Sequence, residues 1–294
     1  MGQLKDVIFD KTISLPKVSF VITTLDCAKD LELLLRSIIA QEYPSLEIVV
    51  VDQGSKDETV EIARNFGAKV FLRKGPLGIA RRVGVENSNG EIIGLLDSDV
   101  IIPHKLWLRK AVQKFIEDDK ISTVWPLNRP QRGQSIFQEL YALFSLYIMR
   151  ERYKKGKGVC GGSNSLFRKK YILEVGNFTP TIHWASDFEI ASKLSQKGYK
   201  VIMHEDMLIH NYKRNFREFI KKEIVGSRSF LMSGLSLTGM SYVELLQEHI
   251  LQGVKFMIQE GVRNRNTIAF LYPLLLITRI LIYGIVFLVG YFSH

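Results

Sequence analysis

The sequence has few cysteines and fewer acidic than basic residues. The first shortage bears on disulfide bonds and cellular compartment, and the second on the charge of the binding partner. Among its 294 residues only Cys27 and Cys160 are cysteines, and Met1–Asp10 carries no secretory signal pattern. These features predict free thiols in a reducing compartment and argue against a disulfide-stabilised scaffold. Because 40 basic residues outnumber 30 acidic ones, the formal charge is +10. This excess predicts an anionic partner, whether nucleic acid, anionic lipid or a phosphorylated ligand.

The first hundred residues alternate between apolar runs typical of strands and segments with helical spacing. The predicted strands are Val18–Thr23, Glu47–Val51, Val70–Leu72 and Ile92–Leu96, and the predicted helices are Asp30–Gln41, Glu58–Phe66 and Ile79–Asn87. Asp57 can cap the second of these helices. The alternation predicts an α/β fold built on a parallel sheet with helices on both faces. A hydrophobic content of 46% excludes general disorder.

Two carboxylates end the fourth predicted strand. Asp97 and Asp99 follow Ile92–Leu96 directly, with one residue between them. Residues two apart on an extended chain point the same way, and ligands of open α/β sheets collect at the carboxyl ends of strands. Oxygen ligands suit Mg²⁺ or Mn²⁺, which proteins usually hold with one or two carboxylates and a substrate's phosphates. The pair is therefore a candidate metal site.

The middle of the chain permits two interpretations of one aromatic-rich helix. The elements predicted here are a helix at Lys105–Phe115, a strand at Ser122–Pro126, a helix at Ser135–Met149, and strands at Leu166–Arg168 and Tyr199–Met203. Ser135–Met149 is either a core helix with a basic end or a helix that lies on a membrane. Its composition favours the core helix.

Other motifs in this region have ordinary structural explanations. The pattern G-x-G-x-x-G occurs at Gly156–Gly161, but it follows a basic helix end, so we treat it as a false match for dinucleotide binding. Asp187 and Glu189 fall where a helix begins, and the helix dipole favours negative charge there. His210, between an apolar and a polar residue, is by itself more typical of a structural histidine than of a metal ligand.

The C-terminal part is basic and apolar. Helices at Phe216–Ile224 and Val243–Ile258 each carry one apolar face, and Thr267–Phe292 is almost wholly apolar, with Arg279 as its only charge. At about 1.5 Å per residue the last segment exceeds the ~30 Å hydrocarbon thickness. It is either one spanning helix or a hairpin in one leaflet, bent near Pro273 or Arg279. Basic residues just before it predict a catalytic part on the cytoplasmic side.

Several motifs in order resemble the family 2 glycosyltransferases of GT-A fold, over roughly Pro16–Tyr212. The motifs are Val18–Thr24, Val51–Asp57, Gly78–Arg82, Leu96–Asp99, Gly176–Phe178, Ser186–Glu189 and His210. The resemblance implies a Rossmann-like mixed sheet with helices on both faces, and the amphipathic and membrane helices predicted above would follow it. It also implies transfer of a sugar from a nucleoside diphosphate to an acceptor.

The resemblance assigns roles to individual positions. Asp187 matches the catalytic base of an inverting reaction, and Asp99 and His210 match metal ligands for Mg²⁺ or Mn²⁺. The implied nucleotide-sugar contacts are Thr23, Thr24, Asp26, Asp52, Arg81, Asp97, Gly162, Ser163 and Asn164. Arg82 departs from a frequent Asn, and Ser186 stands where an acidic residue is common.

Together these features predict a metal-dependent glycosyltransferase with a catalytic domain at 1–212, basic interfacial helices at 213–265 and a membrane segment at 266–294. Its expected partners are a nucleotide-sugar donor, a lipid-linked acceptor such as a polyprenyl phosphate or lipid-linked glycan, and anionic lipids. Nucleic acid is not expected, because the basic residues accompany apolar helices and are not interleaved with aromatics. The alternative is a non-catalytic membrane-bound scaffold that has kept the fold.

Overall fold

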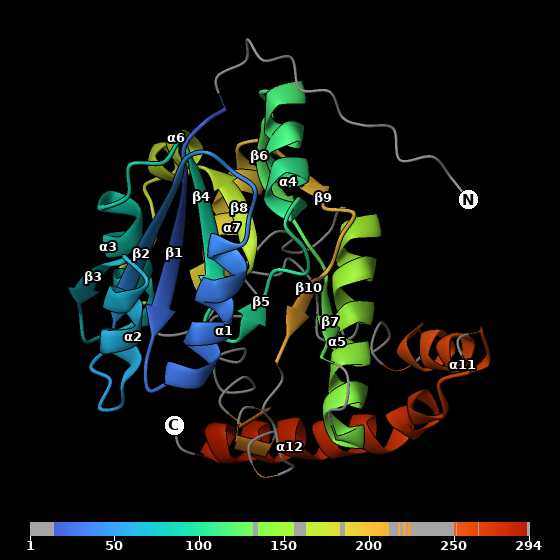
Figure 1. Cartoon of the computed structure of the whole chain (residues 1–294). Helices are drawn as coiled ribbons and strands as arrows, with labels where there is room; N and C mark the ends of the chain where they lie inside the picture. The colour runs from blue at the N-terminus through green and yellow to red at the C-terminus, as the bar shows by residue number, and fades with distance from the viewer. Residues whose placement is uncertain are drawn as a thin grey trace.

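The structure of the chain is a computed structural model (Figure 1). The residues that it describes are 15–131, 135–155, 163–182, 186–211, 217, 220, 221, 223, 224, 250, 252–263 and 265–292. Most of the two predicted amphipathic helices before residue 253 falls outside these ranges. So do Gly162 and the glycine motif Gly156–Gly161, which includes Cys160.

A seven-stranded mixed sheet forms the centre of the fold, in the order β3-β2-β1-β4-β8-β6-β9. The strands are β1 (Val18–Thr24), β2 (Leu46–Asp52), β3 (Lys69–Leu72), β4 (Ile92–Asp97), β6 (Ile121–Trp125), β8 (Ser165–Arg168) and β9 (Lys200–Met203). The first four strands are parallel, as the alternation predicts, because a helix connects each to the next. Strand β8 runs antiparallel to both β4 and β6, which makes the sheet mixed.

Helices cover both faces of this sheet. They are α1 (Ala28–Ile39), α2 (Thr59–Asn65), α3 (Leu77–Glu86), α4 (Trp107–Glu117), α6 (Lys169–Glu174) and α7 (Ser186–Gln196). Alternate residues of β1 pack into two hydrophobic cores, one on each face of the sheet, since side chains of a strand alternate between its faces. Phe20 and Ile22 pack with α1, α2 and α4, whereas Val21 packs with α3, α6 and α7. Asp57 accepts from the backbone N–H groups of Thr59 and Ala28, so it supports the starts of both α1 and α2.

A second, small sheet lies beside the main one, with the order β5-β10-β7. Its strands are β5 (Val100–Ile101), β7 (Asn128–Pro130) and β10 (Leu208–His210). Strand β10 is antiparallel to β5 and parallel to β7, and His210 pairs with Val100. Because β5 follows β4 directly in the chain, this pairing places the end of β10 beside the carboxyl end of β4.

A third core joins the middle of the chain to its end. Helix α5 (Ile136–Lys155) packs with α11 (Gly253–Arg263), with the 3₁₀ helix η3 (Thr267–Leu271) and with α12 (Tyr272–Phe292). Leu140, Phe144 and Tyr147 of α5 are buried in this core. The core-helix interpretation of this segment is therefore confirmed, and α5 continues past the predicted end at Met149.

The C-terminal segment differs from the prediction in its boundaries. Helix α11 extends to Arg263, beyond the predicted end at Ile258. The apolar segment is divided at Tyr272, where η3 gives way to α12, and Pro273 fits the first turn of α12 because that turn needs no N–H donor. Thr267–Val286 is long and apolar enough to cross a membrane, a criterion that core helices of soluble proteins also meet.

Candidate active site

Polar side chains gather at the edge of the sheet where β1, β2 and β4 end. The strand register places Thr24 beside Asp52 and Thr23 beside Asp97. This edge is where parallel sheets bind ligands, because the backbone N–H groups and loops converge there.

Asp52 is buried, and its own loop holds its carboxylate. Oδ1 accepts from the N–H groups of Gly54 and Ser55, both at 2.9 Å, and Oδ2 accepts from the hydroxyls of Thr24 and Ser55 at 2.9 and 2.5 Å. Burial alone would raise the pKa of Asp52, but these hydrogen bonds lower it. Asp52 therefore shapes the turn after β2, and its predicted contact with the base or ribose stays a prediction.

Asp97 is held by Asn164, which precedes the antiparallel strand β8. The Asn164 amide donates to Asp97 Oδ2 at 3.0 Å and accepts from the Asp97 backbone N–H at 2.8 Å. Asn164 adopts a positive φ of 58°, a conformation that asparagine tolerates better than most residues. The reversed direction of β8 thus delivers Asn164 to the same edge as the ends of the parallel strands.

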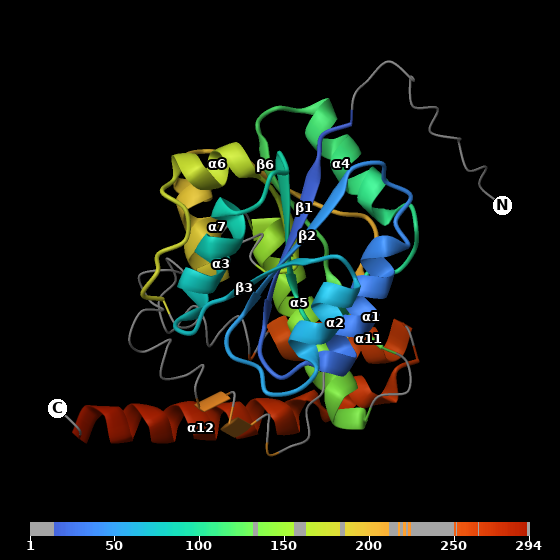
Figure 2. The same ribbon diagram turned by 60° about the vertical axis from the view of Figure 1, so that its left-hand side comes forward.

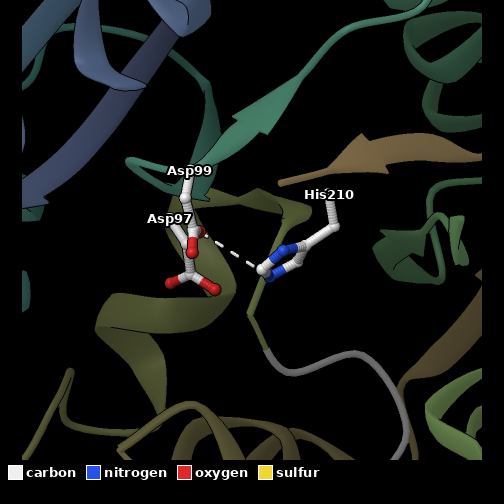
Figure 3. Close-up of side chains that lie close together, drawn as sticks. All are labelled: Asp97, Asp99 and His210. Carbon is white, nitrogen blue, oxygen red and sulfur yellow. Dashed lines mark ion pairs between the residues drawn. The ribbon is translucent and has the colours of Figure 1, made fainter. Parts of the chain in front are cut away.

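His210 reaches Asp99 through the small sheet. Asp99 immediately precedes β5, His210 ends β10, and the two strands are paired. The Asn211 N–H also donates to the Asp99 carbonyl at 2.8 Å, which fixes the end of β10 at this point. As a result His210 Nε2 lies 3.6 Å from Asp99 Oδ1 (Figure 3).

Asp97, Asp99 and His210 form a cluster that can hold a metal ion (Figure 3). Each offers one ligand atom, and these atoms lie within 4.8 Å of one another. Two carboxylates and an imidazole suit a divalent cation such as Mn²⁺. The donor set therefore fits the predicted metal.

Arg81 on α3 lies between this cluster and Asp187 at the start of α7. The guanidinium is 3.5 Å from Asp97 Oδ1 and 3.4 Å from Asp187 Oδ1, and it donates to Ser186 Oγ at 2.9 Å. The Arg81 side chain is only 4% exposed. A planar guanidinium presents several donors in a fixed geometry, so its two terminal nitrogens can each face a different carboxylate.

Helices α3 and α7 are fixed relative to each other by the segment between β8 and α7. A Cβ on Gly78 would lie 2.1 Å from the Thr179 carbonyl oxygen, so only glycine permits this approach. Glu189 accepts from the N–H and hydroxyl of Thr179, and Arg82 donates to the carbonyls of Gly176 and Phe178. Glu189 thus has a structural role, whereas Asp187 faces Arg81 and the Ser163 N–H, 3.3 Å away.

The site concentrates negative charge. Burial raises the pKa of Asp97; Arg81 and His210 oppose this shift, and the nearby carboxylates Asp99 and Asp187 add to it. A divalent cation would offset part of this charge.

The remaining predicted residues lie at the margin of the site or outside the described part. Thr23 is partly buried at the end of β1. Asp26 is exposed, has a positive φ of 47° and accepts from the Lys56 N–H at 2.7 Å. Gly162 is not among the described residues. The contact of Ser186 with Arg81 was not predicted, because the two residues lie far apart in sequence and no local spacing pairs them. Asn211 contributes its backbone N–H to the Asp99 carbonyl, whereas its side chain donates to Asp30.

The mixed sheet and the carboxylates at its edge define a glycosyltransferase of GT-A fold. The family model for glycosyl transferase family 2 matches residues 19–176. The chain therefore belongs to this family, which confirms the resemblance.

Two relatives illustrate the range of similarity. Glycosyltransferase AglE of Haloferax volcanii is 29% identical over 223 residues, which cover 72% of each protein. The uncharacterized glycosyltransferase RT0329 of Rickettsia typhi is 35% identical over 209 residues, which cover 66% of this chain and 63% of the relative.

Solved structures share the fold. The mannosyltransferase PcManGT from Pyrobaculum calidifontis, in complex with GDP-Man and Mn²⁺, has a TM-score of 0.57 at 22% identity, covering 75% of this chain and 64% of that one. The glucosyl-3-phosphoglycerate synthase of Mycobacterium tuberculosis has a TM-score of 0.54 at 20% identity, covering 77% and 81%. The matched region is thus less than two thirds of the Rickettsia and Pyrobaculum chains.

Proposed function

We propose that this protein is an inverting, metal-dependent glycosyltransferase that moves a sugar from a nucleoside diphosphate to a lipid-linked acceptor at a membrane. One observation carries the proposal. One buried guanidinium, that of Arg81, lies within ion-pair distance of both Asp97 in the candidate metal cluster and a separate carboxylate, Asp187. Transfer needs both a charge that stabilises the departing diphosphate and a base for the acceptor hydroxyl.

Asp99 and His210 would hold Mn²⁺ or Mg²⁺, with Asp97 beside them. A bound cation supplies positive charge for the diphosphate as it leaves. The solved complex of PcManGT with GDP-Man and Mn²⁺ supports this cation and donor class. Thr23, Thr24, Asp26, Asp52 and Asn164 would surround the nucleotide sugar, together with Gly162 and Ser163.

Asp187 would act as the base. Its carboxylate takes the proton of the acceptor hydroxyl while that oxygen bonds to the anomeric carbon and the bond from that carbon to the diphosphate breaks. Attack opposite the leaving group inverts the anomeric centre. Arg81 and the Ser163 N–H hold the carboxylate in position.

The acceptor class rests on the C-terminal part. The apolar helix α12 and exposed basic residues such as Lys255, Arg263 and Arg265 favour attachment to a membrane with anionic lipids. A protein with its own attachment meets a polyprenyl phosphate or lipid-linked glycan more readily than a soluble sugar. The proposed division is a catalytic domain at 1–212, interfacial helices at 213–265 and a membrane segment at 266–294. The catalytic domain is proposed to lie on the cytoplasmic side.

The donor is tested with a panel of GDP-mannose, UDP-glucose and UDP-N-acetylglucosamine. Purified protein in detergent should hydrolyse or transfer from one of them only with Mn²⁺ or Mg²⁺. Asp99→Asn should abolish metal-dependent donor binding in calorimetry while the melting temperature stays near that of the wild type. The matched control is Asp118→Asn, which alters an exposed ion pair with Lys200. Normal donor and metal binding by Asp99→Asn would exclude Asp99 as a ligand.

The base is tested separately. Asp187→Asn should keep donor and metal affinity but lose transfer by about 10²–10⁴-fold, because only proton removal is missing. Near-normal transfer by this variant would contradict the assignment. Failure of every donor in both the wild type and the variants would instead favour the non-catalytic scaffold.

A further inference from the structure

Helix α12 has two apolar faces, one buried against the protein and one exposed. Tyr272, Leu275 and Leu276 are buried against the core that α12 shares with α5 and α11. On the opposite face Leu274, Ile277, Leu281 and Ile285 are between 54% and 63% exposed. Their spacing of three or four residues makes one continuous stripe along the helix.

This stripe is part of a larger exposed apolar surface, which we call the apolar strip. It contains nine of the seventeen large hydrophobic side chains that are exposed in the described residues, within one short part of the chain. Its members are Ile258, Val262, Phe270, Leu271, Leu274, Ile277, Ile280, Leu281 and Ile285. Phe270 packs on Gly261, where a Cβ would lie 2.8 Å from the ring, and so joins η3 and α12 to α11. Such a concentration marks an interaction site.

The one charge in α12 points away from the strip. Arg279 pairs with Glu223 at 3.0 Å, and its guanidinium lies 4.2 Å from the centre of the Phe144 ring of α5. Both charged side chains are largely buried, at 14% and 7% exposure. The ion pair therefore ties α12 to the body of the protein and leaves the outer face uncharged.

This arrangement disfavours a helix that crosses the bilayer. Lipid tails surround a spanning helix, so the buried face of α12, the Arg279–Glu223 pair and the adjoining part of α5 would all enter hydrocarbon. A buried ion pair and a folded core helix are costly to place there. A helix that lies in the plane of one leaflet keeps its inner face on the protein and its outer face in lipid.

The overall arrangement agrees with this orientation. In Figure 1 α12 runs crosswise along the lower edge of the molecule, and β1 points its carboxyl end toward that edge. Figure 2, turned by 60°, shows α12 along the same edge and extending beyond the catalytic part. The edge of the sheet that carries the site thus faces the same side as α12. The exposed basic residues Lys255, Arg263 and Arg265 adjoin the strip and suit anionic head groups.

We propose that the apolar strip docks in a single leaflet of an anionic bilayer, with α12 parallel to the membrane surface and both chain ends on the same side. This deepens the proposed function, because a lipid-linked acceptor in that leaflet would then reach the site edge without leaving the membrane. The partner of the apolar strip in this proposal is the lipid surface.

Docking is tested by flotation of the full chain with phosphatidylcholine vesicles, with and without phosphatidylglycerol. Wild-type protein should float with the anionic vesicles, and the double variant L274E/L281E should reduce the bound fraction at least about tenfold. The control L173E/I116E alters two exposed apolar residues on α6 and α4 and should float like the wild type. Metal-dependent donor hydrolysis in detergent should be unchanged in both variants. A loss there would point to a damaged site, and would thus separate failure of docking from failure of the proposed activity.

Orientation is tested with protease-cleavable tags at both ends of the full chain, in inside-out vesicles from expressing cells. A helix in the plane exposes both tags to added protease. Cleavage at the N-terminal tag with protection at the C-terminal one means a spanning helix and overturns the proposal. Failure of the wild type to float, with a dimer that L274E/L281E converts to monomer in sedimentation, also overturns it, because the strip would then bind a second copy.

Discussion

The substitution Arg81→Lys tests whether one guanidinium organises both halves of the site. Arg81 contacts Asp97, Asp187 and Ser186 at 3.5, 3.4 and 2.9 Å. Lysine keeps the charge, but its single ammonium cannot reach both carboxylates and the hydroxyl from the same position. The change therefore removes contacts while the net charge of the site stays constant.

The expected loss follows from those contacts. Arg81 donates one hydrogen bond, to Ser186 Oγ, and a hydrogen bond that involves a charged group contributes about 1.5–3 kcal/mol. Its contacts with Asp97 and Asp187 are ion pairs, and the pair with the partly exposed Asp97 adds at most about 1 kcal/mol. A loss of about 2–3 kcal/mol of transition-state stabilisation corresponds to about 30- to 150-fold in kcat/KM. Most of it should appear in kcat, because the change displaces the proposed base Asp187 and leaves the proposed cation ligands Asp99 and His210 in place.

The assay is metal-dependent transfer from the active donor of the panel, together with Mn²⁺ affinity and melting temperature. Arg36→Lys is the matched control, since Arg36 pairs with Glu32 on an exposed part of α1. It should stay within about threefold of the wild type. If Arg81→Lys also keeps wild-type kcat and kcat/KM, the guanidinium does not position the base and the bridging role is wrong.

Three further predictions concern the cluster, the sheet and the contact between helices. His210→Gln should weaken Mn²⁺ binding in calorimetry by about tenfold or more, since loss of ligand support alone costs about 10–100-fold, and unchanged affinity would remove it from the ligand set. Burial would raise the pKa of Glu47, but hydrogen bonds from Asn89, Lys69 and Ser19 lower it from 4.5 to about 2. The stabilisation that ionised Glu47 gives the folded state is therefore present above pH 4.5 and is lost as the pH falls toward 2. In urea denaturation, Glu47→Gln should therefore lower the free energy of unfolding by on the order of 3 kcal/mol at neutral pH, and by progressively less in acid. Gly78→Ala should lower the free energy of unfolding by about 1–3 kcal/mol and reduce transfer, because its Cβ would collide with a backbone carbonyl, and an unchanged melting temperature would contradict the close approach.

The sequence predicts the layered part of the fold well, because burial on both faces leaves a direct signal. The strands around Val18–Thr24 and Ile92–Asp97 are apolar runs bounded by turn residues, and each was placed within a residue or two. The direction of β8 was not predicted, because a four-residue apolar strand carries no information about which way it runs. That direction depends on its neighbours in the sheet.

The site residues likewise include some that local sequence predicts and some that depend on distant parts of the chain. Asp97 and Asp99 follow from local spacing, since both end one strand. The approach of His210 to Asp99 depends on the pairing of β10 with β5, which joins distant parts of the chain, so only the family resemblance indicated it. Asp187 and Glu189 look equivalent at a helix start, yet one faces Arg81 and the other holds Thr179. Likewise the pairing of Arg279 with Glu223 joins residues far apart in the chain, so the apolar segment alone does not indicate it.

The reversed strand β8 has a consequence for how such an enzyme can be diversified. Parallel strands present to a ligand only the loops that follow them, here those after β1, β2 and β4. Because β8 runs the other way, Ser163 and Asn164, which directly precede it, reach the same edge. Exchanging the stretch between α5 and β8 with that of a relative, while Asn164 is kept, should therefore retune substrate choice without altering strand order. The fold thus offers protein engineers a replaceable segment whose fixed end, Asn164, already positions the Asp97 carboxylate.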